Sequence, residues 1–140
     1  MEGSSIEGVL AESRRNLRRV EPADLATEVA AGAVVVDTRP EHNRVSEGAL
    51  PGALVVERTV LEWRLDPTSP DRLPGFEDPQ ARVVVVCNEG YSSSLAAESL
   101  QRLGMANATD LVGGYRQWLA DVGTQHDGCR RPRAEGPGSG

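Results

Sequence analysis

The chain has 140 residues, of which 39% are hydrophobic and 26% are charged, values typical of one soluble globular domain. A formal net charge of −6 and a pI near 4.9 argue against a nucleic-acid surface, which would need clustered basic residues. The sequence has no apolar run as long as a membrane span and no signal-peptide core, so we expect a cytoplasmic protein without a membrane partner.

Two cysteines, Cys87 and Cys129, are too few for a disulfide framework and favour a reducing compartment. The histidines His42 and His126 show no metal-ligand spacing with them, so we expect no metal and no cofactor. Residues 123–140, which include Cys129, are rich in Gly, Pro and Arg and are predicted to be a disordered tail. We expect no stable disulfide between the two cysteines, because tethering such a tail would cost conformational entropy.

Residues 1–19 are predicted to be an extension that carries a short amphipathic helix over Ile6–Arg18. This helix either packs on the domain or is frayed, and its arginines are expected to form a solvated face rather than a partner contact. A second helix is predicted over Pro22–Ala31, where the proline suits a first turn and Gly32 ends the helix.

Residues 20–122 are predicted to form the domain itself, in which short apolar strands alternate with helices. The predicted strands are Ala33–Asp37, Ala53–Val56, Arg82–Val86 and Thr109–Val112. The predicted helices are Thr59–Leu65, Ser92–Leu103 and Gly114–Val122, the last with Tyr115, Trp118 and Leu119 on one face. Four prolines mark residues 66–79 as a loop. Unbroken Val-rich strands indicate a parallel sheet covered on both faces, so the predicted fold class is a three-layer α/β domain.

Cys87 comes at the carboxyl end of one of these strands, where ligands of parallel sheets gather. The reactive form of cysteine is the thiolate, and the dipole of the following helix would favour it. Gly90 allows a tight curl, and Ser92 or Ser93 can cap the helix or donate a hydroxyl to an anion. The sequence therefore predicts an anion-binding loop around the Cys87 thiolate, made of Asn88, Glu89, Gly90, Tyr91, Ser92 and Ser93.

Alternatives remain open for several of these residues. Cys87 could be a small buried hydrophobe that ends a core strand. His42 could act as a base near Cys87 or lie on a surface loop, and Trp63 could line the pocket or pack.

Three motifs resemble the signatures of rhodanese-like domains, and together they cover about Val20 to Val122. "VVVDTRPEHNRVSEGALPGALVV" (Val34–Val56) resembles the first signature, through Asp37, Arg39, Gly48, Pro51, Gly52 and Ala53. "VVVVCNEGYSSS" resembles the active-site loop of the family. "LVGGYRQW" (Leu111–Trp118) resembles the C-terminal signature, through Gly113, Gly114 and Trp118.

The resemblance implies a sulfurtransferase in which Cys87 takes a sulfane sulfur from a small anion such as thiosulfate. The resulting persulfide would pass its outer sulfur to cyanide or to a low-molecular-weight or protein thiol. A covalent intermediate of this kind splits one transfer into two steps, and backbone N–H groups would stabilise its charge. Asp37 and Arg39 are expected to tie loops together rather than to touch substrate. A non-catalytic rhodanese-like binding or regulatory module is the alternative, although such modules commonly lack the cysteine.

The sequence departs from the family pattern at two places. Ser92 stands where members with strong thiosulfate activity often carry an arginine, and Ala49 and Leu50 replace a His-Ile pair. We therefore expect poor use of thiosulfate. A related branch of phosphatases needs an arginine that clamps phosphate, but position 93 is serine and the next arginine is Arg102.

Overall fold

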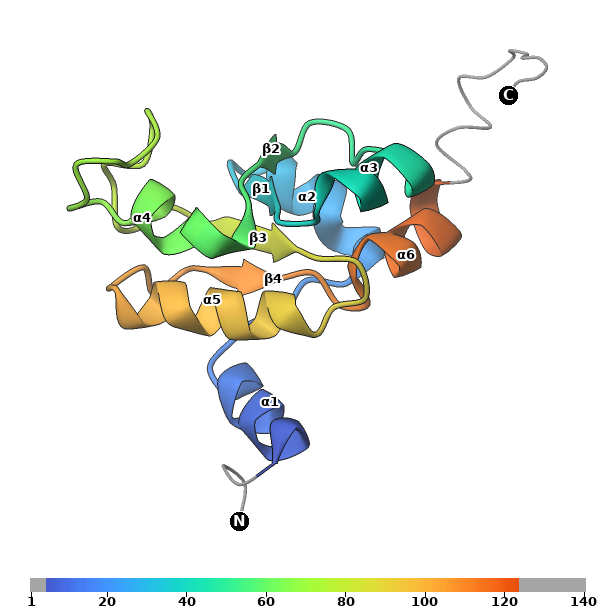
Figure 1. The fold of residues 1–140 in the computed structure, drawn as a ribbon, viewed down its shortest axis with the longest axis horizontal. Helices are drawn as coiled ribbons and strands as arrows, with labels where there is room; N and C mark the ends of the chain where they lie inside the picture. The colour runs from blue at the N-terminus through green and yellow to red at the C-terminus, as the bar shows by residue number, and fades with distance from the viewer. Residues whose placement is uncertain (1–4, 124–140) are drawn as a thin grey trace.

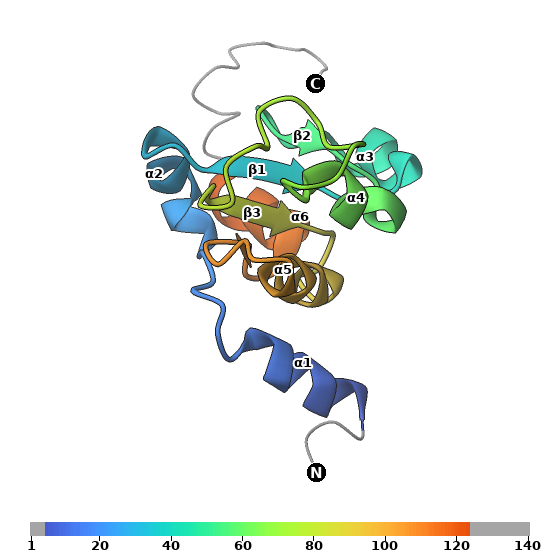
Figure 2. The ribbon, with the colours of Figure 1, turned by 90° about the vertical axis from the view of Figure 1, so that its left-hand side faces the viewer.

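The structure, a computed structural model, describes residues 5–123 and is organised around a four-stranded parallel sheet (Figure 1). The strands follow the order β2-β1-β3-β4, with β1 at Val34–Asp37, β2 at Leu54–Val55, β3 at Val83–Val86 and β4 at Thr109–Asp110. Strands β1 and β3 pair over their full length, from Val34 opposite Val83 to Asp37 opposite Val86. Figure 2 shows β1, β2 and β3 running in the same direction. The predicted parallel α/β fold is confirmed.

The helices fall close to the predicted positions, with one addition. They are α1 (Ile6–Arg14), α2 (Leu25–Ala30), α3 (Glu41–Glu47), α4 (Leu61–Leu65), α5 (Ser92–Arg102) and α6 (Gly114–Trp118). Short 3-10 turns at Pro22–Asp24 and Arg58–Val60 precede α2 and α4, and a π turn at Leu119–Gly123 follows α6. Helix α1 ends before the predicted Arg18 because the chain must then extend towards the sheet, where Val20 bridges Leu111. Helix α3 was not predicted.

Two apolar cores lie on the two faces of the sheet, as a three-layer architecture requires. Val83 and Val85 face one core, which α4 and α5 complete with Leu61, Leu65, Ala96, Ala97 and Leu100. Val84 and Val86 face the other core, to which α2 and α6 contribute Leu25 and Tyr115, with Trp118 and Leu119 packed at its edge. All four valines of β3 are fully buried, which explains why this strand is apolar throughout.

Helix α1 lies outside these layers and packs on α5, as Figures 1 and 2 both show. Leu10 and Leu17 are buried on the inner side of this extension. Within residues 5–123, no helix combines the length and the apolar character that crossing a membrane requires. The predicted tail beyond residue 123, with His126 and Cys129, falls outside the described residues.

Candidate active site

Cys87 directly follows β3 and is 7% exposed, at the carboxyl edge of the sheet. It lines a pocket of about 250 Å³ whose other walls are Thr38, Arg39, Pro40, Asn88, Glu89, Tyr91 and Ser92. The pocket thus brings most of the predicted loop around the sulfur. The two remaining residues of the predicted loop, Gly90 and Ser93, are buried and do not line the pocket.

The sulfur accepts two backbone hydrogen bonds. The N–H of Gly90 donates to Cys87 Sγ at 3.1 Å, and the N–H of Ser93, in the first turn of α5, donates at 3.3 Å. Donors fixed in this way stabilise negative charge on sulfur more than they stabilise the neutral thiol. Gly90 adopts a φ of +85°, and a Cβ there would lie 2.7 Å from the backbone nitrogen of Gly113. The loop therefore needs glycine both for its backbone angle and for its close approach to α6.

The serine hydroxyls do not all serve the pocket. Ser93 Oγ and Ser94 Oγ each donate to Asp110 Oδ2 at 2.7 Å, and Asp110 is fully buried at the end of β4. The Ser93 hydroxyl therefore donates to Asp110 and not to an anion in the pocket, as the sequence had suggested it could. Tyr91, rather than Ser92, is the N-cap residue of α5, without a side-chain cap, whereas Ser92 is exposed at the pocket wall.

A cluster of charges holds the rim of the loop. Arg116 of α6 donates to both carboxylate oxygens of Glu47, at 3.0 and 3.1 Å, and also pairs with Glu89. Asn88 Nδ2 donates to Glu47 Oε2 at 3.2 Å. Hydrogen bonds from Arg116, Asn88 and Asn43 lower the pKa of Glu47 to about 2, and Glu47 in turn raises the pKa of Arg116. Glu47 and Arg116 are therefore both ionised over the whole physiological pH range.

The Gly-Gly signature brings α6 against the loop. The N–H of Tyr115 donates to Cys87 O at 2.8 Å, and the N–H of Arg116 donates to Asn88 O at 3.1 Å. A Cβ on Gly114 would lie 2.6 Å from Cys87 O. These contacts explain why a side chain at position 114 is incompatible with the observed loop.

Asp37 and Arg39 form a buried ion pair with Nη2 to Oδ2 at 2.8 Å. Arg39 Nη2 also donates to Gly48 O at 2.9 Å, and its guanidinium lies 3.9 Å over the centre of the Tyr115 ring. This pair therefore ties the segment after β1 to the turn before β2 and to α6. Arg39 nevertheless contributes to the wall of the Cys87 pocket.

Several predicted residues lie elsewhere. Pro51, Gly52 and Trp118 line a separate apolar pocket beside α2, of about 360 Å³. His42 is exposed on α3 rather than on a loop, and neither it nor the exposed Trp63 lines the Cys87 pocket. Within residues 5–123, no group of three His, Cys, Asp or Glu side chains is placed to bind a metal ion.

Five charged residues that contact the loop or its supports were not among the predicted site residues: Arg14, Arg19, Glu47, Asp110 and Arg116. Asp110 could not be placed at a strand end from the sequence, because the predicted strand Thr109–Val112 continues past it, whereas β4 ends at Asp110, at the same edge of the sheet as Cys87. The expected solvated face of the N-terminal helix is wrong for Arg14, which donates to Gly90 O at 2.8 Å. Arg19, which directly follows the predicted helix, pairs with Asp110.

Two curated proteins whose names include a sulfurtransferase are similar to this chain in sequence. It is 30% identical over 96 residues to adenylyltransferase and sulfurtransferase MOCS3 of Arabidopsis thaliana, and 31% over 90 residues to the corresponding UBA4 of Candida albicans. Each match covers 64% of this chain but 20% of the relative, so the chain spans about a fifth of the length of these curated relatives.

Solved structures show the same fold. The human single-domain sulfurtransferase TSTD1 matches with a TM-score of 0.60 at 25% identity, over 74% of this chain and 96% of that one. A Rhodopseudomonas palustris protein of unknown function, described as a possible tyrosine phosphatase, matches with a TM-score of 0.75 at 29% identity, covering 83% and 89%. The sequence model of the rhodanese-like domain family matches residues 21–121 of this chain. This chain therefore belongs to the rhodanese-like domain family.

Proposed function

We propose that the protein is a sulfurtransferase that carries sulfane sulfur as a persulfide on Cys87. The observation that carries the proposal is the pair of amide hydrogen bonds from Gly90 and Ser93 to Cys87 Sγ, at the floor of an open pocket. A core cysteine of purely structural role does not need two donors directed at its sulfur. The sulfurtransferases among the similar proteins support the same chemistry.

The reaction takes two displacements. The Cys87 thiolate attacks the sulfane sulfur of the donor, an S–S bond forms, and the donor remainder leaves with the electrons of the bond that breaks. With thiosulfate that remainder is sulfite. An acceptor thiolate or cyanide then attacks the outer sulfur of the persulfide, and Cys87 leaves as a thiolate. The amides of Gly90 and Ser93 donate to Sγ, so they stabilise Cys87 as the attacking thiolate and again as the leaving thiolate, as an oxyanion hole stabilises oxygen.

A donor with less charge than thiosulfate suits this pocket better. Glu89 and the uncharged Ser92 both line it, and the guanidinium of Arg39 is already paired with Asp37. The acceptor we propose is a low-molecular-weight or protein thiol, which an open pocket admits. Because Cys87 must stay reduced to act, a cytoplasmic location fits this chemistry.

A phosphatase reaction is disfavoured by the position of the next arginine. Arg102 lies in the last turn of α5, whereas Cys87 lies beside its first turn. An eleven-residue helix spans about 15 Å. Arg102 is therefore out of reach of a phosphate bound at the sulfur.

The test is to incubate reduced protein with thiosulfate and, separately, with a low-molecular-weight persulfide, and to measure intact mass. In a Cys129→Ser background, we expect a gain of one sulfur atom that a thiol acceptor removes. Cys87→Ser should abolish the gain, and Ser92→Ala is the matched control that should retain it. No adduct from either donor would favour the non-catalytic module, and an adduct in Cys87→Ser would refute the mechanism.

A further inference from the structure

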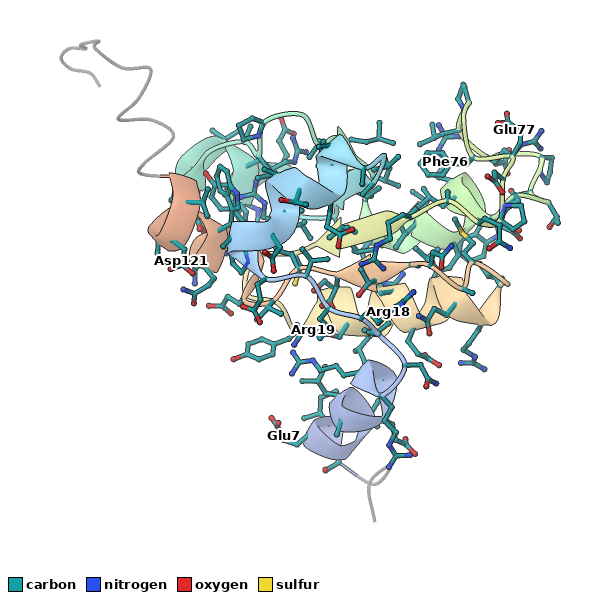
Figure 3. All side chains as sticks on the ribbon, turned by 180° about the vertical axis from the view of Figure 1, so that it is seen from behind. Glu7, Arg18, Arg19, Phe76, Glu77 and Asp121 are labelled. Atoms are coloured by element: carbon teal, nitrogen blue, oxygen red, sulfur yellow. The ribbon has the colours of Figure 1, made fainter. Side chains whose placement is uncertain are left out.

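Two arginines of the N-terminal extension reach the back of the Cys87 loop. Arg14 of α1 donates from Nη2 to Gly90 O at 2.8 Å and from Nε to Ser94 Oγ at 2.9 Å. Arg19, on the segment that joins α1 to the sheet (Figure 3), donates to Gly90 O at 3.2 Å and pairs with Asp110 at 2.8 Å. Both arginines lie outside residues 21–121, the part of the chain that matches the family.

The residues that this extension holds are the same ones that bind the sulfur. Gly90 donates its N–H to Cys87 Sγ while its carbonyl accepts from both arginines. Ser93 donates its N–H to the sulfur while its hydroxyl donates to Asp110, the partner of Arg19. Hydrogen bonds in such a chain polarise one another, and those from an ionised donor are the strongest.

Arg14 also fixes the direction of one further amide. The Gly90 carbonyl points at the guanidinium groups, and in a trans peptide the C=O and the next N–H point in opposite directions. The N–H of Tyr91 is therefore turned away from the arginines, and Tyr91 lines the Cys87 pocket. A donor on that side of the peptide would serve a charge that extends beyond the sulfur, such as the outer atom of a persulfide.

The charges of this group do not cancel. Arg19 neutralises the buried carboxylate of Asp110. Arg14 makes its hydrogen bonds to neutral acceptors, and no ion pair neutralises it within the described part of the chain. One positive charge thus remains behind a loop that has Ser92 where an arginine is common in the family.

We propose that Arg14 is a positioning residue for the Cys87 anion, supplied by a helix outside the matched domain. It orients the Gly90–Tyr91 peptide and provides the positive charge that the loop itself lacks. Helix α1 therefore contributes directly to the geometry and the charge of the site. The role in sulfur transfer rests on the proposed function, whereas the effect on the Cys87 thiolate does not.

The test measures the rate of alkylation of Cys87 by iodoacetamide against pH, in a Cys129→Ser background. In Arg14→Gln, we expect the midpoint of this profile to rise by about half a pH unit or more, because a partly buried positive charge is lost. In Arg14→Lys, which keeps the charge, the midpoint should rise less than in Arg14→Gln. Arg18→Gln removes an exposed arginine of the same extension and should leave the midpoint unchanged. The kcat/KM for sulfur transfer should fall roughly tenfold in Arg14→Gln.

An unchanged midpoint in Arg14→Gln would overturn the proposal, and so would an equal shift in Arg18→Gln. Circular dichroism and thermal unfolding establish that the variants are folded. If Arg14→Gln unfolds, the midpoints of Arg14→Lys and Arg18→Lys are compared instead. A lysine cannot bind two acceptors as a guanidinium does, so the midpoint should rise in Arg14→Lys and stay unchanged in Arg18→Lys. Equal midpoints in these two variants would overturn the proposal. A shifted midpoint in a protein that never accepts sulfur would refute the proposed function and leave the assignment of Arg14 standing.

Discussion

Glu89 and Arg116 form an ion pair that joins the Cys87 loop to α6. The negative charge that Glu89 brings to the pocket is therefore partly balanced by a cation held in place by Glu47. Both side chains of the pair are more than half exposed, at 54% and 53%, so solvent screens the interaction. The pair therefore weakens the electrostatic repulsion between Glu89 and an anionic sulfur donor without removing it.

Removing the charge of Glu89 should improve the use of thiosulfate by a modest factor. In Glu89→Gln, Arg116 stays bound to Glu47 and presents more of its charge to the pocket mouth. We expect kcat/KM for thiosulfate to rise about two- to fivefold, the range that one exposed charge pair supports. Glu89→Asp, which keeps the charge, is the control and should show no gain. A loss of activity in Glu89→Gln would mean that the pair is needed to hold the loop.

Adding a cation at position 92 should have a larger effect. Ser92 is exposed on the wall of the Cys87 pocket, so a longer side chain there has room to reach a bound anion. A charge-assisted hydrogen bond contributes about 1.5–3 kcal/mol, so Ser92→Arg should raise kcat/KM for thiosulfate roughly tenfold or more. The gain should shrink as salt is added, because the site is open to solvent.

Ser92→Gln separates charge from size in this experiment, since it lengthens the side chain without a cation. Its kcat/KM for thiosulfate should stay near that of the wild type. If the wild type already uses thiosulfate efficiently and Ser92→Arg changes nothing, backbone amides alone bind the anion and our expectation about the donor is wrong.

The sheet and the position of Cys87 could be predicted because their signals are local. The four valines of β3 are buried on both faces, and this burial produces the continuous apolar run in the sequence. The loop that follows could be placed because Cys87 and Gly90 mark a strand end and a tight turn. The hydrogen-bond partner of the Ser93 hydroxyl could not be predicted, because Asp110 lies 17 residues away in the sequence, on another strand.

Helix α3 gave no usable signal, because none of its residues is buried and it therefore has no apolar period. It nevertheless carries Glu47, which organises the rim. Arg14 is separated from Gly90 by 76 residues, and an arginine on an amphipathic helix looks the same in sequence whether it meets solvent or a carbonyl. Contacts of this kind depend on how α1 docks, which local pattern does not encode.

The acid sensitivity of the protein should depend on Glu47. Its pKa is about 2 in the folded protein, lowered from 4.5 by hydrogen bonds from Arg116, Asn88 and Asn43. A lowered folded-state pKa stabilises the fold above the unfolded value, and this stabilisation is lost as the pH falls from about 4.5 to about 2. Glu47→Gln should therefore be less stable than the wild type near neutral pH, with the difference narrowing at about pH 3.

Urea unfolding at both pH values measures this difference. Glu57→Gln, a change at an exposed glutamate outside the cluster, is the control and should follow the wild type at each pH. A gap between Glu47→Gln and the wild type that stays constant with pH would show that the effect of the substitution is not due to ionisation.

The close approach of Gly114 to the Cys87 loop predicts that a single methyl group there disrupts the site. Gly114 has a φ of +67°, and a Cβ would lie 2.6 Å from Cys87 O and 2.7 Å from the nitrogen of Glu89. Gly114→Ala should therefore suffer both backbone strain and a clash with backbone atoms that cannot move without shifting the loop. We expect a loss of stability together with a loss of sulfur transfer.

Gly104→Ala separates the two effects, because Gly104 has a φ of +96° but nothing lies within 4 Å of its Cβ position. This control should lose only about 1–2 kcal/mol of stability, the cost of a left-handed backbone for a residue with a side chain. Urea unfolding should find Gly114→Ala less stable than Gly104→Ala, and the Gly104 variant should keep its sulfur transfer. Equal stability and activity in the two variants would mean that the loop around Cys87 yields to α6, and that its hydrogen bonds to the sulfur do not depend on the Gly-Gly signature.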